Sequence, residues 1–170
     1  MNKKVEKAIN EQINAELWSA YLYLSMSAHF ANEGLNGFAN WFRIQWQEET
    51  THAMKFFDYL IERGGKPELK PIKAVETKWN NPLHAFEETL KHEKVVTSLI
   101  NNLMDIAIEE KDHATKGFLQ WFVDEQVEEE ANAQELIDTL KLIKGEGNGL
   151  FMIDRELKQR TFVDETAGAE

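Results

Sequence analysis

The sequence predicts an all-α fold: a four-helix bundle of two antiparallel hairpins joined by a long crossover, with a short fifth helix at the C-terminus. Apolar residues recur in alternating steps of three and four along four long stretches, which is the period of a buried helix face. The 3 prolines and 9 glycines are clustered, so they leave these stretches uninterrupted. Between the second and third stretches lie 18 residues without any period, and crossing the length of a bundle would explain a connection that long.

The first hairpin is expected to contain helices at residues 5–33 and 36–63. Gly34 can end the first helix, Asn36 can start the second, and Gly64 with Gly65 stops it. The buried stripes of the two helices are Ile9, Ile13, Glu16, Ala20, Tyr23, Ser27 and Phe30, then Phe38, Phe42, Gln45, Glu49, His52, Phe56, Tyr59 and Arg63.

Residues 64–81 are predicted to form the crossover. Extended chain of this length reaches up to ~60 Å, whereas the helices are only ~40 Å long, so the second and third helices can run parallel. The second hairpin is expected at residues 82–110 and 112–144, with Pro82 in the first turn and a break at Lys111-Asp112. The glycine-rich segment 145–149 should break the chain before a fifth helix at 150–160, and the acidic tail 164–170 is expected to be mobile. Residues 1–170 are thus interpreted as a single domain.

The composition excludes several kinds of function. The chain has no cysteine, so it cannot form disulfides, thiolate metal sites or iron–sulfur clusters, and it lacks a cysteine nucleophile. This fits a reducing compartment, and a cytoplasmic location is predicted. We see neither an apolar leader nor a run of about twenty apolar residues that would indicate a membrane-spanning segment. The net charge of −11 disfavours nucleic acid as a partner and favours cations.

Each of the four stripes is interrupted by polar residues of the kinds that bind metals, and the interruptions share one spacing. In each hairpin the glutamate that interrupts the first stripe is followed by two polar residues 33 and 36 positions later, and the second set is offset from the first by 77. The two sets are Glu16, Glu49 and His52, then Glu93, Gln126 and Glu129. Glu16 lies 18 residues before Gly34 and His52 lies 18 after it, which places both ~27 Å from the hinge.

All four glutamates should therefore meet at one level of the bundle core. Four carboxylates cannot stay ionised and buried together without cations. In a purely structural bundle, protonation of some of the glutamates would remove this charge. Two divalent metals sharing a bridging carboxylate would balance it better. An oxygen-rich set with a single imidazole suits iron or manganese better than structural zinc. This resembles the ferritin-like di-iron bundles, in which two helices give one Glu each and two give Glu-x-x-His.

The two halves of the expected site are not equivalent. The second motif is Gln126-x-x-Glu129 in place of Glu-x-x-His, so the second metal should be held less firmly, as suits iron that must be released. Three acidic residues beside the stripes form a solvated face by default, or a third and weaker cation position: Glu48, Glu125 and Glu128. Tyr23 is by default a core aromatic, and alternatively a hydrogen-bonding or redox-active group beside the metals.

The chain is similar to the non-haem bacterial ferritins, most specifically over residues 10–16, 19–26, 48–55 and 121–130. This resemblance implies that Glu16, Glu49 and His52 hold the first iron. It implies that Glu93 and Glu129 hold the second, with Glu49 bridging and Gln126 beside it. It further implies a third site of Glu48, Glu125, Glu128 and Glu129, and it matches Tyr23 to the family's central tyrosine.

The resemblance also implies a function and an assembly. The expected function is iron storage and detoxification by a ferroxidase that oxidises Fe²⁺ with O₂ or peroxide inside a homo-oligomeric shell of 24 subunits. The fifth helix would then surround the four-fold axes. Haem is not expected, because Thr50 occupies the position of the haem-binding methionine of bacterioferritins. The alternatives are a di-metal oxidase or peroxidase without mineral storage and a structural bundle without metals.

Overall fold

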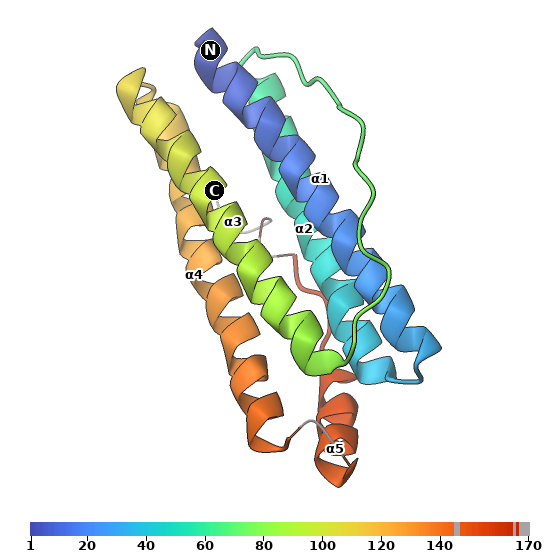
Figure 1. Ribbon diagram of the computed structural model, residues 1–170. Helices are drawn as coiled ribbons and strands as arrows, with labels where there is room; N and C mark the ends of the chain where they lie inside the picture. The colour runs from blue at the N-terminus through green and yellow to red at the C-terminus, as the bar shows by residue number, and fades with distance from the viewer. Residues whose placement is uncertain (145–146, 165, 167–170) are drawn as a thin grey trace.

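The computed structural model describes residues 1–144, 147–164 and 166, and within these ranges it contains five helices and no strand (Figure 1). The helices are α1 (Lys3–Asn32), α2 (Asn36–Glu62), α3 (Pro82–Glu109), α4 (His113–Leu142) and α5 (Gly147–Leu157). The predicted all-α class and the order of four long helices and one short helix are confirmed. The bounds of α1 to α4 differ from those predicted by at most two residues.

The four long helices pack as two hairpins, α1 against α2 and α3 against α4, and α1 also contacts α3. Residues 64–81, which we call the strap, run outside the bundle along α1, so that α2 and α3 are parallel (Figure 1). The strap is fastened to α1 by polar contacts: Asn10 donates to the Lys66 carbonyl at 3.1 Å and accepts from the Glu68 amide at 2.6 Å. Near its end Trp79 is buried in the core.

Most helix ends follow ordinary capping chemistry. Gly34 and Gly64 have φ values of +78° and +70°, which lie in the left-handed region that favours glycine. The side chains of Asn2, Asn81 and Asp112 accept hydrogen bonds from the first turns of α1, α3 and α4.

The start of α2 differs from the expectation for Asn36. This residue is already helical, and the capping position is taken by Leu35, whose side chain cannot accept a hydrogen bond. The cap comes instead from α5: Asp154 Oδ1 accepts from the amides of Gly37 at 2.7 Å and Phe38 at 3.1 Å. A distant carboxylate thus satisfies the amides that a local side chain usually would.

The bounds predicted for the fifth helix were wrong by three residues, because α5 begins at Gly147 and ends at Leu157. Glycine disfavours helix by about 1 kcal/mol, which is why a break was expected through residue 149. Tertiary packing overrides this cost: Gly149 lies so close to Ile143 that an added Cβ would stand 2.9 Å from the Ile143 Cβ. Residues 145–146 of the predicted break, and residues 165 and 167–170 of the predicted mobile tail, lie outside the described residues.

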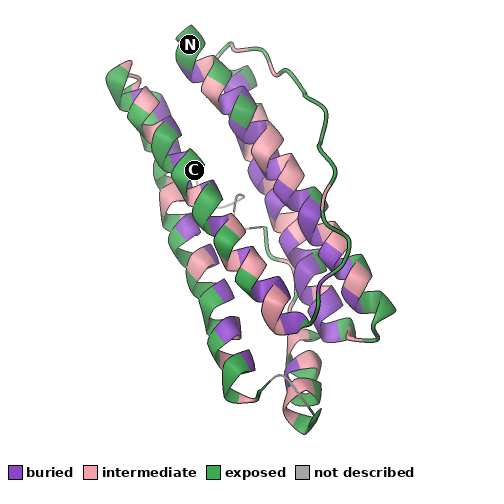
Figure 2. Cartoon of the chain, viewed as in Figure 1, coloured by how far each residue is buried: buried purple, intermediate pink, exposed green. Residues whose placement is uncertain are grey.

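Two hydrophobic clusters fill the bundle, and a polar layer separates them along its length. One cluster includes Phe30, Phe42 and Phe86, and the other includes Ile9, Phe56 and Ile100. Figure 2 shows the buried residues on the inward faces of all four long helices. The buried polar residues between the clusters are Glu16, Gln45, Glu49, His52, Glu93, Gln126 and Glu129. The site predicted from the stripes therefore lies in the middle of the core.

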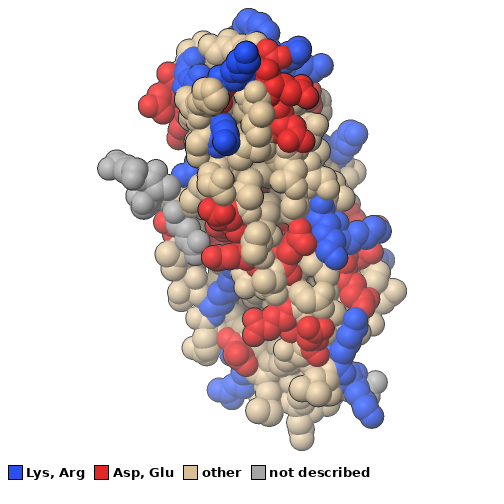
Figure 3. All heavy atoms as spheres, turned by 90° about the vertical axis from the view of Figure 1, so that its left-hand side faces the viewer, with Lys and Arg blue, Asp and Glu red and all other residues tan. Residues whose placement is uncertain are grey.

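The outer surface is rich in charge, in keeping with the net charge of −11. On the face formed mainly by α3 and α4, acidic side chains gather in several patches along the bundle (Figure 3). Over the residues that the structure describes, no helix combines the length and hydrophobicity needed to cross a bilayer.

Candidate metal centre

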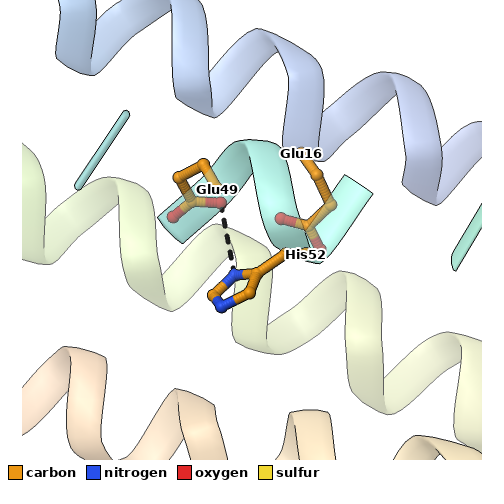
Figure 4. Close-up of side chains that lie close together, drawn as sticks. All are labelled: Glu16, Glu49 and His52. Atoms are coloured by element: carbon orange, nitrogen blue, oxygen red, sulfur yellow. Dashed lines mark ion pairs between the residues drawn. The ribbon is translucent and has the colours of Figure 1, made fainter. Parts of the chain in front are cut away.

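Helices α1 and α2 bring Glu16, Glu49 and His52 together. One ligand atom from each residue lies within 4.8 Å of the other two, and the three residues are only 1%, 2% and 4% exposed. Glu49 and His52 are one helical turn apart, with Nδ1 of His52 3.7 Å from Oε2 of Glu49, and Glu16 faces them from α1 (Figure 4). Elsewhere in the described ranges no other group of acidic and histidine residues meets this distance criterion. These three are the expected ligands of a first metal.

Helices α3 and α4 supply the second set at the same depth. Glu93 is fully buried, and Gln126 and Glu129 are 6% and 5% exposed. Gln126 Nε2 donates to Glu93 Oε2 at 3.2 Å, while Gln45 Nε2 of α2 donates to Glu129 Oε2 at 2.9 Å. The carboxyls of Glu93 and Glu129 are close enough to Glu49 to raise its pKa. The two hairpins thus direct all four glutamates toward one region, as the repeated spacing predicts.

The two halves differ in how their carboxylates are occupied. Glu93 and Glu129 accept hydrogen bonds from the side-chain amides of Gln126 and Gln45, and Glu16 accepts one from Gln12, whereas Oε2 of Glu49 has no partner. Gln126 directs its NH₂ group toward Glu93, at the side-chain carboxylate and at the main-chain carbonyl. An amide binds a cation through its oxygen, so the side-chain amide of Gln126 would have to turn over before Gln126 could bind a cation at this place. The two halves therefore differ in their side chains, His52 in the first and Gln126 in the second, and the weaker binding of a second metal stays a prediction.

The surroundings of the Glu49 carboxylate indicate whether these residues suit a cation. Its Oε2 atom is buried and has no hydrogen-bond partner, which is costly for a carboxylate. Burial raises the pKa of Glu49 well above its usual value, and the carboxyls of Glu16, Glu93 and Glu129 raise it further. An unpartnered oxygen surrounded by acidic groups and an imidazole is the environment that a divalent cation would stabilise.

Burial also shifts the pKa values of the other groups at the centre, upward for the glutamates and downward for His52. Burial raises the pKa of Glu16, against the effect of hydrogen bonds with Glu49 and Gln12, and raises that of Glu93 to about 7. The pKa of Glu129 is raised well above its usual value by burial and by Glu93. Burial and the Lys55 cation lower the pKa of His52 to about 4, which keeps its imidazole neutral and able to bind a metal.

Tyr23 lies at the centre and not merely in the core. Its hydroxyl donates to Glu93 Oε1, its ring stacks on Phe42 with centroids 6.1 Å apart, and it is fully buried. Burial raises its pKa well above the usual value, with Glu93 and Glu49 adding to the effect. Tyr23 therefore stays protonated and orients the Glu93 carboxyl.

Two glutamines at the centre were missed as partners of the glutamates. Gln12 Nε2 donates to Glu16 Oε1 at 2.8 Å, and Gln45 holds Glu129 as described above. Gln12 lies one turn before Glu16 on the same helix, so the spacing could have indicated the pair. Gln45 was placed on the buried stripe, but its contact crosses to α4 and leaves no local signal.

The three residues expected to form a third cation position do not form a group that meets the distance criterion among the described residues, although Glu48 and Glu125 both lie near Glu129. Glu48 is paired with Arg160, whose Nη2 lies 2.8 Å from Oε2. Glu125 Oε1 is 3.8 Å from Nε2 of His52, and Glu128 is exposed. The side chains of Glu48 and Glu125 are 18% and 14% exposed, so this region connects the buried centre to the surface.

Comparisons with known proteins agree with this architecture. The sequence model of the ferritin-like domain family matches residues 6–143 of this chain. A bacterial non-heme ferritin of Bacteroides fragilis is 49% identical over 94% of this chain and 99% of its own, and one from Staphylococcus aureus is 38% identical over 97% and 99%.

Solved structures agree as well. An open-pore ferritin from the hyperthermophilic archaeon Archaeoglobus fulgidus superposes with a TM-score of 0.93 at 49% identity, covering 95% of this chain and 99% of its own. A closed form of that ferritin, engineered by site-directed mutagenesis, gives a TM-score of 0.94 at 49% identity, covering 96% and 99%. With its fold, its polar centre and its relatives in agreement, the chain belongs to the ferritin-like family.

Proposed function

We propose that this protein stores and detoxifies iron as a ferroxidase. In this proposal two Fe²⁺ ions are substrates at a centre within one subunit, Glu49 bridges them, and the ferric product moves on to a mineral inside a shell. Glu16, Glu49 and His52 would bind the first ion, and Glu93 and Glu129 the second, with Gln126 beside it. The names of the curated relatives and the family of the fold support iron as the cation.

The observation that carries the proposal is the buried, unpartnered Oε2 atom of Glu49. It lies 3.7 Å from Nδ1 of His52, and the Glu49 side chain is clustered with Glu16 and close to two further carboxyls. A structural bundle would be expected to satisfy this oxygen with an amide, as it does for Glu93 and Glu129. A cation on each side of Glu49 would satisfy both of its oxygens and offset the charge of the four carboxylates.

The reaction needs two electrons, and two ions supply one each. Two Fe²⁺ become two Fe³⁺, while O₂ takes up two electrons and two protons to give H₂O₂, or H₂O₂ is reduced to two water molecules. Carboxylates that move between terminal and bridging binding can follow the change in charge. The second set consists of Glu93, Gln126 and Glu129. It would release its ferric ion first, because it has no imidazole and because Gln126 presents its NH₂ group to Glu93.

The proposal extends to the assembly and to the route of iron. We infer a homo-oligomeric shell of 24 subunits in the cytoplasm, without haem, and a third, transient iron position at Glu48, Glu125, Glu128 and Glu129. Family membership supports the shell. The exposed or partly exposed acidic residues between the buried centre and the surface support the transient position.

The substitution Glu49→Ala tests the bridging role. Loss of a shared ligand should lower the initial rate of Fe²⁺ oxidation, followed as ferric absorbance in air, by about tenfold to a hundredfold. Glu62→Ala removes an exposed carboxylate from the end of the same helix and should leave the rate unchanged. Rapid oxidation by Glu49→Ala would contradict the bridging assignment.

A second measurement separates storage from oxidase chemistry. After repeated aerobic additions of Fe²⁺, particle size and iron content are determined on the purified assembly. Hundreds of irons retained per assembly would support storage. Steady turnover with about two irons bound per subunit would favour a di-metal oxidase, and absence of iron binding would contradict both.

A further inference from the structure

The chain beyond α5 turns back along α2 and places a cation on the acidic region beside the metal centre (Figure 1). Arg160 Nη2 donates to both oxygens of Glu48, at 2.8 Å and 3.0 Å. The Arg160 side chain is 25% exposed and that of Glu48 is 18% exposed, so the pair is largely shielded from water. Glu48 directly precedes Glu49, the proposed bridging ligand, and lies close enough to Glu129 to raise the pKa of that buried carboxyl.

Arg160 is held in this place by several contacts besides the ion pair. Its guanidinium lies over the Trp41 ring, with Cζ 4.8 Å from the centroid, and Nη1 donates to the Trp41 carbonyl at 3.3 Å. The side-chain amide of Asn40 donates to the main-chain carbonyls of Leu157 at 3.0 Å and Arg160 at 2.9 Å. The bonds from Asp154 to the start of α2 fix α5 itself. These contacts make Arg160 a positioned group.

We propose that Arg160 is a built-in competitor for the cation at Glu48, so that the third position binds iron weakly and passes it on. This inference rests on the proposed function, because it assumes that Glu48 takes part in a third position. Both oxygens of Glu48 are occupied by the guanidinium, so a cation there must displace Arg160 or share the carboxylate with it. In either case the ion pair lowers the affinity of that position and leaves Glu16, Glu49 and His52 untouched.

The charges around Glu48 explain why such a counter-ion is useful. Glu48 and Glu125 lie close enough to Glu129 to raise its pKa further. With Arg160 in place, Glu48 is balanced when no iron is present, and the guanidinium can return when iron leaves. Arg160 is thus a positioning residue for the release of iron and takes no part in the oxidation.

The test uses Zn²⁺, which binds without redox chemistry, titrated calorimetrically into the assembled, metal-free protein. Arg160→Gln should raise the affinity of the weakest class of sites by about fivefold, because a partly buried ion pair no longer has to be broken. The tighter classes should be unchanged. Arg160→Lys keeps the charge but not the planar guanidinium, so its affinity should lie between those of the natural protein and Arg160→Gln. Arg155→Gln removes an exposed arginine from α5 and should resemble the natural protein.

The double substitution with Glu48→Gln separates competition from a general loosening of the tail. In the Glu48→Gln background, Arg160→Gln should have no further effect on the weakest class. An unchanged or lower affinity in Arg160→Gln, or an equal gain in both backgrounds, would overturn the inference. Failure of the proposed function would be seen elsewhere in the same titration, as absence of the two tighter classes from the natural protein.

Discussion

Tyr23 and Glu93 form the contact at the centre that depends most on a single atom. The Tyr23 hydroxyl donates to Glu93 Oε1, and both residues are fully buried. The Tyr23 ring packs on Phe42 within the hydrophobic cluster, and the hydroxyl is its only polar atom. The hydroxyl therefore determines both the orientation of Glu93 and the cost of burying it.

The substitution Tyr23→Phe removes this atom and keeps the ring. Glu93 would lose one of its partners, which should lower the free energy of unfolding of the metal-free protein by about 1–3 kcal/mol. Denaturant unfolding monitored by circular dichroism measures this. Tyr21→Phe is the matched control, since Tyr21 is 50% exposed and should tolerate the change. Equal stability of the two variants would show that the hydroxyl does not support Glu93.

For individual residues, the sequence predicts which side chains reach the centre but not which hydrogen-bond partners they have there. The spacing of Glu16, Glu49, His52, Glu93 and Glu129 follows from the helical period, and all five are buried at one level. The bond from Gln45 to Glu129 joins residues 84 positions apart. Contacts between hairpins depend on how helices rotate against each other, and a single sequence does not encode that rotation locally.

The packing of α5 on α2 depends on a glycine of α2. Gly37 lies in the first turn of α2, where a Cβ atom would stand 1.6 Å from the Asp154 carbonyl oxygen. The same contact lets Asp154 cap α2 through its side chain. Glycine is therefore needed at this position for close approach, and not for an unusual backbone angle.

The substitution Gly37→Ala should displace α5 from α2. Loss of the cap alone costs about 1 kcal/mol, and trypsin should cut faster after Lys158 and Arg160. Gly117→Ala is the counterpart within α4, where an added Cβ meets nothing within 4 Å, and should be neutral or stabilising by up to about 1 kcal/mol. The prediction fails if Gly37→Ala is digested at the same rate as Gly117→Ala.

The elements themselves illustrate what sequence patterns can establish. The long helices were predicted to within two residues, because glycine, proline and capping residues mark their ends. The start of α5 was predicted three residues too late, because packing of Gly149 on Ile143 outweighs its low helix propensity. Asp154 gave no signal as a cap for α2, since it lies more than one hundred residues away.

For the whole molecule the dominant property is its negative charge, −11 per chain. An acidic surface concentrates cations near it, and salt screens that attraction over about 10 Å at 0.1 M ionic strength. The initial rate of Fe²⁺ oxidation at low iron should therefore fall several-fold between about 0.01 M and 0.3 M salt, as measured by stopped-flow absorbance. Sodium and choline chloride should act alike; an effect specific to sodium would indicate competition at a site.

The strap has a consequence for the ancestry of the chain. It runs outside the bundle and joins two hairpins that each contribute three residues to the centre, in the same relative positions. Fusion of two copies of one helical hairpin, with a linker added between them, would produce such a layout. The two hairpins differ at the last of these positions, where the first carries the imidazole of His52 and the second the carboxylate of Glu129.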